Sequence, residues 1–213
     1  MRAHERSSPP REGTALFPVF LRLAGRRVVV VGAGSVASDK IAALLLTGAS
    51  ITVVAPEVHE SIARSPVTVQ RRAFAPSDLD GAWFVLAAAT PEVNRQVREA
   101  AEERRVFVNA VDDLVSASVY TGGVLRRGGV TIAISTEGRA PALAGLLREG
   151  LDALVPLEVE SWVREASNLR ENQRRAGVPM TRRRPALLEA LNRLYAEKAE
   201  GEREVAVGAG GRS

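Results

Sequence analysis

The fold of this chain is decided by residues 26–56, whose sequence is RRVVVVGAGSVASDKIAALLLTGASITVVAP. Val28–Val31 form an unbroken β-branched run, which is typical of a parallel strand buried on both faces. A glycine-rich turn, an apolar helical stretch at Ile41–Leu46 and a second strand at Ile51–Val54 follow it. This order of elements predicts an α/β protein whose first domain is built on a Rossmann-type parallel sheet.

The turn satisfies the pattern G-x-G-x-x-G/A through Gly32, Gly34 and Ala37. In this pattern the first glycine permits the tight turn, and the second lets the backbone approach a pyrophosphate. The small third residue lets the helix pack close to the strand, so that the amino end of the helix faces the phosphates. Because a strand, a helix and a second strand surround the pattern, a dinucleotide site is favoured over a purely structural turn.

The position that usually recognises the adenosine ribose is altered in this chain. A carboxylate normally ends the second strand, about twenty residues past the first glycine. Ala55 and Pro56 stand there instead, and Glu57 follows. Ribose recognition therefore uses Glu57, backbone groups or neither. No basic cluster suited to a 2′-phosphate is nearby, which favours NAD over NADP.

Composition narrows the function classes. The chain has 213 residues, of which 46% are hydrophobic, so it can build a sizeable core. It has no cysteine, which excludes disulfides, thiolate metal sites and a cysteine nucleophile. The two histidines, His4 and His59, fall in an expected tail and an expected loop and cannot make a His-rich zinc site. Apolar runs are too short to span a membrane and no secretory signal is evident, so we expect a cytoplasmic protein.

The net charge is only +4, but basic residues concentrate in Arg164–Arg184. Three interpretations stay open for this region: a solvated helix face, a surface for a polyanionic small molecule, or a nucleic-acid surface. Aromatic residues that stack on bases are few, which makes nucleic acid the least favoured of the three.

Further strands are expected at Pro66–Val69, Trp83–Ala89 and Val106–Val108, with a helix over Glu92–Arg104. Thr90 follows the fourth strand, and Asn109 to Asp113 follow the fifth. Both sets therefore lie at the carboxyl edge of the sheet, where such sheets bind ligands. Asp112 and Asp113 suit either turn capping or a general base, and position alone does not decide between these roles.

The remainder of the chain changes pattern. Short strands are expected at Ser118–Tyr120, Val124–Leu125 and Val130–Ser135, separated by glycine pairs. Pro141 opens an amphipathic helix that ends near Leu154. The rest, to residue 199, is predicted to be helical with breaks at Pro156, Gly177 to Pro179, and Pro185.

Several motifs in one order now carry a family resemblance. They are FPVFLRLAGRRVVVVGAGSVASDKIAALL, VVAPE, LAAAT, VNAVDD and VTIAISTEGRAPALAGLLREGLD. Over residues 15–155 the chain resembles the siroheme-synthase dehydrogenase family, whose members are precorrin-2 dehydrogenases and often also sirohydrochlorin ferrochelatases. The NxVDD motif and the IAIST block give the resemblance its specificity, because ordinary Rossmann enzymes lack them.

The resemblance implies a division of the chain. An NAD-binding Rossmann domain is expected at residues 14–113, a strand-rich dimerisation segment exchanged between subunits at 114–149, and a helical domain at 150–200. Residues 1–13 and 201–213 are expected to be disordered tails. The protein is therefore expected to be a homodimer.

The resemblance also implies roles for individual residues. Asp112 matches the aspartate that acts as the base and takes part transiently in metal insertion. The expected cofactor residues are Gly32, Gly34, Ser35, Val36, Ala37, Pro56, Glu57 and Thr90. The expected substrate residues are Asn109, Asp113, Ser135, Thr136 and Arg139.

The activity implied is NAD-dependent oxidation of precorrin-2 to sirohydrochlorin, in which a hydride passes to NAD⁺ and a proton leaves the macrocycle. Insertion of ferrous iron is a second implied activity. The alternative is an NAD(H)-binding sensor without turnover, which would not require Asp112. An unrelated dehydrogenase is less favoured, because neither lysine, Lys40 or Lys198, stands four residues after a tyrosine.

Two departures from the family pattern lie near the expected substrate cavity. Thr90 is followed directly by Pro91, so the loop over the cofactor should be short. Glu137 stands where the family more often has glycine. A carboxylate there would oppose the carboxylates of the substrate unless an arginine such as Arg139 offsets it. These departures bear on substrate fit and metal insertion more than on NAD binding.

Overall fold

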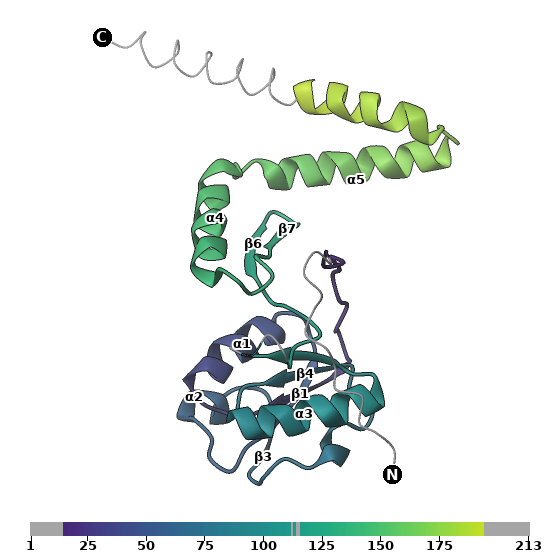
Figure 1. Ribbon diagram of the computed structural model, residues 1–213. Helices are drawn as coiled ribbons and strands as arrows, with labels where there is room; N and C mark the ends of the chain where they lie inside the picture. The colour runs from purple at the N-terminus through teal and green to yellow at the C-terminus, as the bar shows by residue number, and fades with distance from the viewer. Residues whose placement is uncertain (1–14, 112, 114–115, 194–213) are drawn as a thin grey trace. The chain divides into compact units, whose positions relative to one another are not determined.

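The computed structural model describes residues 15–111, 113 and 116–193, which form two compact units (Figure 1). The first unit extends to Thr121 and also takes in Glu137–Arg139. The second holds Gly122–Thr136 and continues from Ala140.

The first unit is built on a five-stranded parallel sheet with the order β3-β2-β1-β4-β5. This order places the first strand in the centre, as in one half of a Rossmann fold, and confirms the predicted fold class. The strands are β1 (Arg27–Val31), β2 (Ser50–Val54), β3 (Thr68–Gln70), β4 (Phe84–Ala87) and β5 (Phe107–Ala110).

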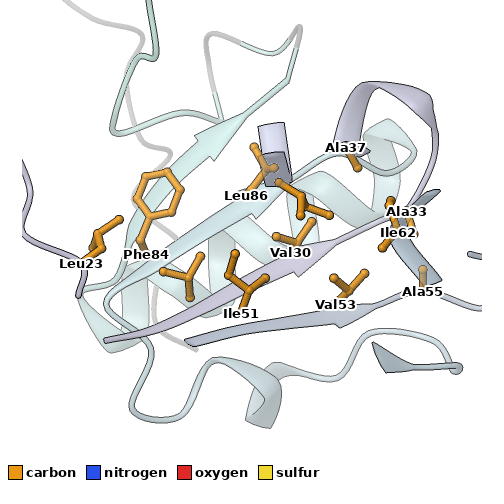
Figure 2. Packing of buried hydrophobic residues seen from close by; sticks show 12 residues of the cluster. Leu23, Val30, Ala33, Ala37, Ile51, Val53, Ala55, Ile62, Phe84 and Leu86 are labelled. Carbon is orange, nitrogen blue, oxygen red and sulfur yellow. The ribbon is translucent and has the colours of Figure 1, made fainter. Parts of the chain in front are cut away.

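Both faces of this sheet are buried. Val28 and Val30 of β1 join a cluster on one face with residues of α1 (Ser35–Leu45) and α2 (Glu60–Ala63) (Figure 2). Val29 and Val31 join the opposite cluster with residues of α3 (Pro91–Arg104) and the short 3₁₀ helix η1 (Pro76–Leu79). The continuous valine run is explained by this placement, because alternate side chains of one strand face opposite sides.

The second unit contains an antiparallel hairpin and helices. The hairpin pairs β6 (Gly123–Arg127) with β7 (Val130–Ile134), and α4 (Pro141–Leu154) and α5 (Val159–Arg175) follow. The Arg127 guanidinium donates to the Asp152 carboxylate at 2.6 Å and to the Asp152 carbonyl at 2.8 Å, which ties the hairpin to α4. A further helical run covers 180–193 after the break at Gly177 to Pro179.

Two expectations from the sequence are wrong. Ser118–Tyr120 form no strand, because the amides of Ser118 and Val119 both donate to the Val108 carbonyl and the Ser118 hydroxyl accepts from the Val108 amide. The Ser118 hydroxyl thus takes the place of the backbone carbonyl that would accept from Val108 in a regular β-ladder. Pro185 does not break its helix, which continues through it over residues 180–193; the φ of proline suits a helix, and the helix tolerates the missing backbone donor.

Within the described part of the chain, no helix is both long and apolar enough to cross a membrane.

Candidate functional site

The glycine turn begins where β1 ends, and Gly32 is required there for two physical reasons. Its φ is +97°, in the region that favours glycine. A Cβ added at this position would lie 2.2 Å from the Ala88 carbonyl oxygen, just beyond β4. The Gly32 amide also donates to the Val54 carbonyl at 3.0 Å, which joins the turn to the end of β2.

Gly34 has a different environment. It is the N-cap of α1 with φ of −81°, and an added Cβ would meet no atom of a described residue within 4 Å. Among the described residues, no side chain caps the helix, and its first turn carries no acidic residue. Ser35 and Val36 are exposed, whereas Ala37 is fully buried against the sheet. Uncapped amides beside an open glycine form the type of cradle that a pyrophosphate occupies, so these residues fit a dinucleotide.

The loop after β2 lies against this turn. Pro56 and Glu57 are exposed, and the His59 amide donates to the Ala33 carbonyl at 3.0 Å. The Ser61 hydroxyl lies 2.8 Å from His59 Nδ1 and 2.7 Å from the Ser38 hydroxyl. This set links the first turns of α1 and α2 beside the expected cofactor residues. Ser38 and Ser61 are 23 positions apart in sequence, so no spacing pattern indicated their contact.

Thr90 and the buried Asn94 shape the end of β4. Thr90 is the N-cap of α3, and its hydroxyl accepts from the Val93 amide at 3.5 Å. Asn94 Oδ1 accepts from the Ala89 amide at 3.0 Å. The sequence interpretation did not single out Asn94, since a polar residue inside an amphipathic helix carries no distinct spacing signal.

Asn109 organises the end of β5. This residue is buried, and its Nδ2 donates to the Val119 carbonyl at 2.9 Å. Asn109 Oδ1 accepts from the Thr121 hydroxyl at 3.3 Å, and that hydroxyl accepts from Lys40 Nζ at 2.9 Å. The network reaches from α1 to the last strand of the sheet.

Of the two aspartates after β5, the structure describes Asp113 but not Asp112. Asp113 Oδ1 accepts from the Ser116 amide at 3.0 Å, which is the contact of a turn-capping aspartate. Asp112, the expected base, lies outside the described residues. Among the residues that are described, no group of three His, Asp or Glu could hold a metal ion.

The IAIST block places the other expected substrate residues just after β7. Ser135 is exposed, and the Thr136 hydroxyl accepts from the Ala140 amide at 3.2 Å. Glu137 has φ of +56°, which explains why a glycine suits this position. Arg139 forms an ion pair with Glu137, as the charge argument from the sequence anticipates.

Four of these positions share one edge of the sheet. The glycine turn, Pro56 and Glu57, Thr90 and Asn109 occupy or follow the carboxyl ends of β1, β2, β4 and β5. Strands β1 and β4 are neighbours, so the connections after them lie at the point where the strand order reverses. Ligands of open α/β sheets bind at this crevice.

Comparisons with known proteins agree with this arrangement. The family model described as "Putative NAD(P)-binding" matches residues 19–123, and the model for the central part of a sirohaem biosynthesis protein matches 127–154. Siroheme synthase 3 of Aeromonas hydrophila is 40% identical over 172 residues, and the siroheme synthase of Photorhabdus laumondii is 36% identical over 184. These matches cover 78% and 84% of this chain.

The same matches cover 37% and 39% of the two relatives, so the chain spans well under half of their length. A solved structure of SirC, a precorrin-2 dehydrogenase, matches 82% of this chain and 88% of its own, with a TM-score of 0.62 and 27% identity. The chain therefore belongs to the siroheme synthase amino-terminal family, in which a Rossmann-type NAD(P)-binding domain precedes the central sirohaem-biosynthesis segment.

Proposed function

We propose that this protein oxidises precorrin-2 to sirohydrochlorin with NAD⁺. The observation that carries the proposal is the likeness to SirC, which extends through both units of the fold rather than the dinucleotide domain alone. Sequence identity of 27% over 82% of the chain supports relatedness beyond a shared Rossmann topology.

The cofactor proposal rests on the glycine turn and the loop after β2. The α1 amides and the open space at Gly34 would hold the pyrophosphate, and Thr90 would line the same crevice. Glu57 is exposed beside this turn, and a carboxylate there disfavours the 2′-phosphate of NADP. NAD⁺ is therefore the proposed cofactor, and when bound it supplies the hydride acceptor.

Asp112 is the proposed base that takes the proton lost by the macrocycle. Its position in sequence, two residues after β5, supports this role, because the carboxyl ends of the parallel strands share the cofactor edge. Asn109, Asp113, Ser135 and Thr136 are the proposed substrate neighbours. Since Arg139 pairs with Glu137, the Glu137 carboxylate opposes the carboxylates of the substrate less than a lone charge would.

Three further proposals follow from family membership. Ferrous iron is a second substrate that Asp112 would help to insert. The chain works as a homodimer through residues 114–149. The protein acts in the cytoplasm, where NAD⁺ is available.

The deciding experiment supplies the purified chain with enzymatically generated precorrin-2 and NAD⁺ under anaerobic conditions. NADH formation together with the absorbance of sirohydrochlorin establishes the dehydrogenase, and NADP⁺ in place of NAD⁺ tests the cofactor choice. Adding Fe²⁺ to the product then tests metal insertion. NAD⁺ binding with no oxidation of precorrin-2 would refute the proposal and favour a sensor.

A further inference from the structure

Lys40 makes a contact that no part of the glycine-turn pattern explains. It is the sixth residue of α1, beyond Gly34 and Ala37. Its Nζ donates to the Thr121 hydroxyl at 2.9 Å, across 81 positions of sequence. Thr121 is the last residue before the boundary between the two units, so the contact joins α1 to the end of the first unit's main segment.

The chemistry of the groups determines which atom donates and which accepts in each hydrogen bond of this network. An ammonium group only donates, so the Thr121 oxygen accepts from Lys40. The hydrogen of the Thr121 hydroxyl is then available for Asn109 Oδ1, at 3.3 Å. This orients the Asn109 amide, whose Nδ2 donates to the Val119 carbonyl at 2.9 Å. Asn109 is only 6% exposed, and a buried amide needs such partners.

The network holds together the two ends of one segment, residues 110–118, which we call the aspartate segment because Asp112 and Asp113 belong to it. Asn109 precedes the segment at the end of β5, and Val119 follows it. The amides of Ser118 and Val119 both donate to the Val108 carbonyl at 2.9 Å, so the chain returns to the strand that it left. By donating to Thr121, Lys40 links the end of this segment to α1, the helix that begins at the glycine turn.

We propose that Lys40 is a positioning residue: acting through Thr121 and Asn109, it fixes the ends of the aspartate segment relative to α1. The catalytic meaning of this role rests on the proposed dehydrogenase function, in which α1 holds the cofactor and the segment carries the base. The charge of Lys40 matters because a hydrogen bond from an ionised donor is stronger than one between neutral groups.

The first test measures the segment directly and needs no activity. In the full-length chain, Lys40→Met should raise amide hydrogen exchange at Ser118 and Val119, whose donors face the Val108 carbonyl. Asp39→Asn, which removes an exposed charge from the preceding position on α1, is the matched control and should leave that exchange unchanged. Unaltered exchange in Lys40→Met would overturn the proposal.

The second test separates positioning from cofactor binding. Lys40→Met should lower kcat for precorrin-2 oxidation about tenfold while the KM for NAD⁺ changes less than about twofold, because misplaced groups slow the chemical step. Lys40→Arg should have a kcat close to that of the unaltered protein, since a guanidinium also donates to a hydroxyl. Thr121→Val should reproduce the loss, and the double variant Lys40→Met/Thr121→Val should be no slower than the slower single variant.

A defect confined to the KM for NAD⁺, additive effects of the two substitutions, or no recovery with arginine would each contradict positioning. If the unaltered protein oxidises no precorrin-2, the proposed function fails, whereas the exchange measurement still decides the role of Lys40.

Discussion

Gly32 and Gly34 stand two residues apart, yet the structure needs them for different reasons. Gly32 has a φ of +97° and no space for a Cβ beside Ala88. Gly34 has an ordinary φ and open space around it in the described part of the chain, so a bound ligand would account for a glycine there. The two positions therefore separate the stability of the turn from its binding function.

We predict that Gly32→Ala lowers the free energy of unfolding by about 4 kcal/mol, through backbone strain and overlap with the Ala88 carbonyl. Gly34→Ala should change it by less than about 1 kcal/mol, as expected of an exposed N-cap. It should nevertheless raise the Kd for NAD⁺ at least about tenfold, because the added methyl group occupies the expected pyrophosphate space. Denaturant titration and fluorescence titration with NAD⁺ measure the two effects. Normal NAD⁺ affinity in Gly34→Ala would show that the cofactor does not bind at this turn.

Asp112, the proposed base, can be tested by removing its carboxylate. Asp112→Ala should fold and bind NAD⁺ normally but lose precorrin-2 oxidation, because the proton acceptor is removed. Asp113→Ala differs from it: this substitution also loses the cap of the Ser116 amide, so it should lower the free energy of unfolding, which Asp112→Ala should not. Near-normal oxidation by Asp112→Ala would remove Asp112 from the mechanism.

The connection from β3 to η1 depends on one buried carboxylate. Asp78 is only 6% exposed, and Arg72 donates to both of its oxygens, to Oδ2 at 2.8 Å. The Ala75 amide also donates to Asp78 Oδ2 at 2.8 Å. The hydrogen bond from Arg72 is the largest influence on the carboxyl and lowers the pKa of Asp78, although burial opposes this shift.

This contact predicts a pH dependence. The pKa of Asp78 is lower in the folded protein than its unfolded value near 3.9, so its stabilising contribution is complete above about pH 5. The contribution is lost as the pH falls through the folded pKa. Asp78→Asn should cost about 2 kcal/mol at pH 7, and the difference from the unaltered protein should shrink in acid. Urea titrations from pH 7 down to pH 3 measure both effects.

Asp80 provides the matched control for Asp78. Its carboxylate pairs with Arg104 at 2.8 Å, but its side chain is 67% exposed. Exposed ion pairs contribute little to stability, so Asp80→Asn should change the free energy of unfolding only slightly at every pH. Equal effects of the two substitutions would show that burial of Asp78 is not the cause of the loss of stability in Asp78→Asn.

The second unit of the molecule leaves apolar surface uncovered. Its only described sheet is the two-stranded hairpin β6-β7, which Arg127 links to α4. Leu143, Leu146 and Leu147 of α4 are all exposed, Leu146 to 65%. A second copy of the chain is the proposed cover, in keeping with the dimerisation segment expected at residues 114–149.

We predict that the protein is a dimer and that Leu146→Glu shifts it toward monomer, because the substitution places a charge in an apolar interface. Leu46→Glu, at the 76%-exposed C-cap of α1, is the matched control and should leave the dimer intact. Light scattering coupled to size-exclusion chromatography measures the mass of each variant. A monomeric unaltered protein would refute the assignment.

The Rossmann sheet, the glycine turn and the family could be predicted from the sequence alone. These features rest on local patterns: β-branched runs, glycine spacing and the order of short motifs. The sequence also predicted α4 between Pro141 and Leu154 with the observed ends, because a proline at the first helical position marks such a start.

Which distant side chains meet depends on the folded chain and could not be predicted from the sequence. The bonds from Lys40 to Thr121, from Ser38 to Ser61, and from Arg72 to the buried Asp78 join separate elements or both ends of a loop, and no periodicity encodes them. The expected strand at Ser118–Tyr120 failed for the same reason: the Ser118 hydroxyl and the Asn109 amide bind the backbone in place of a neighbouring strand. Sequence patterns report what a segment buries, whereas the partners of its polar groups depend on how the chain folds back upon itself.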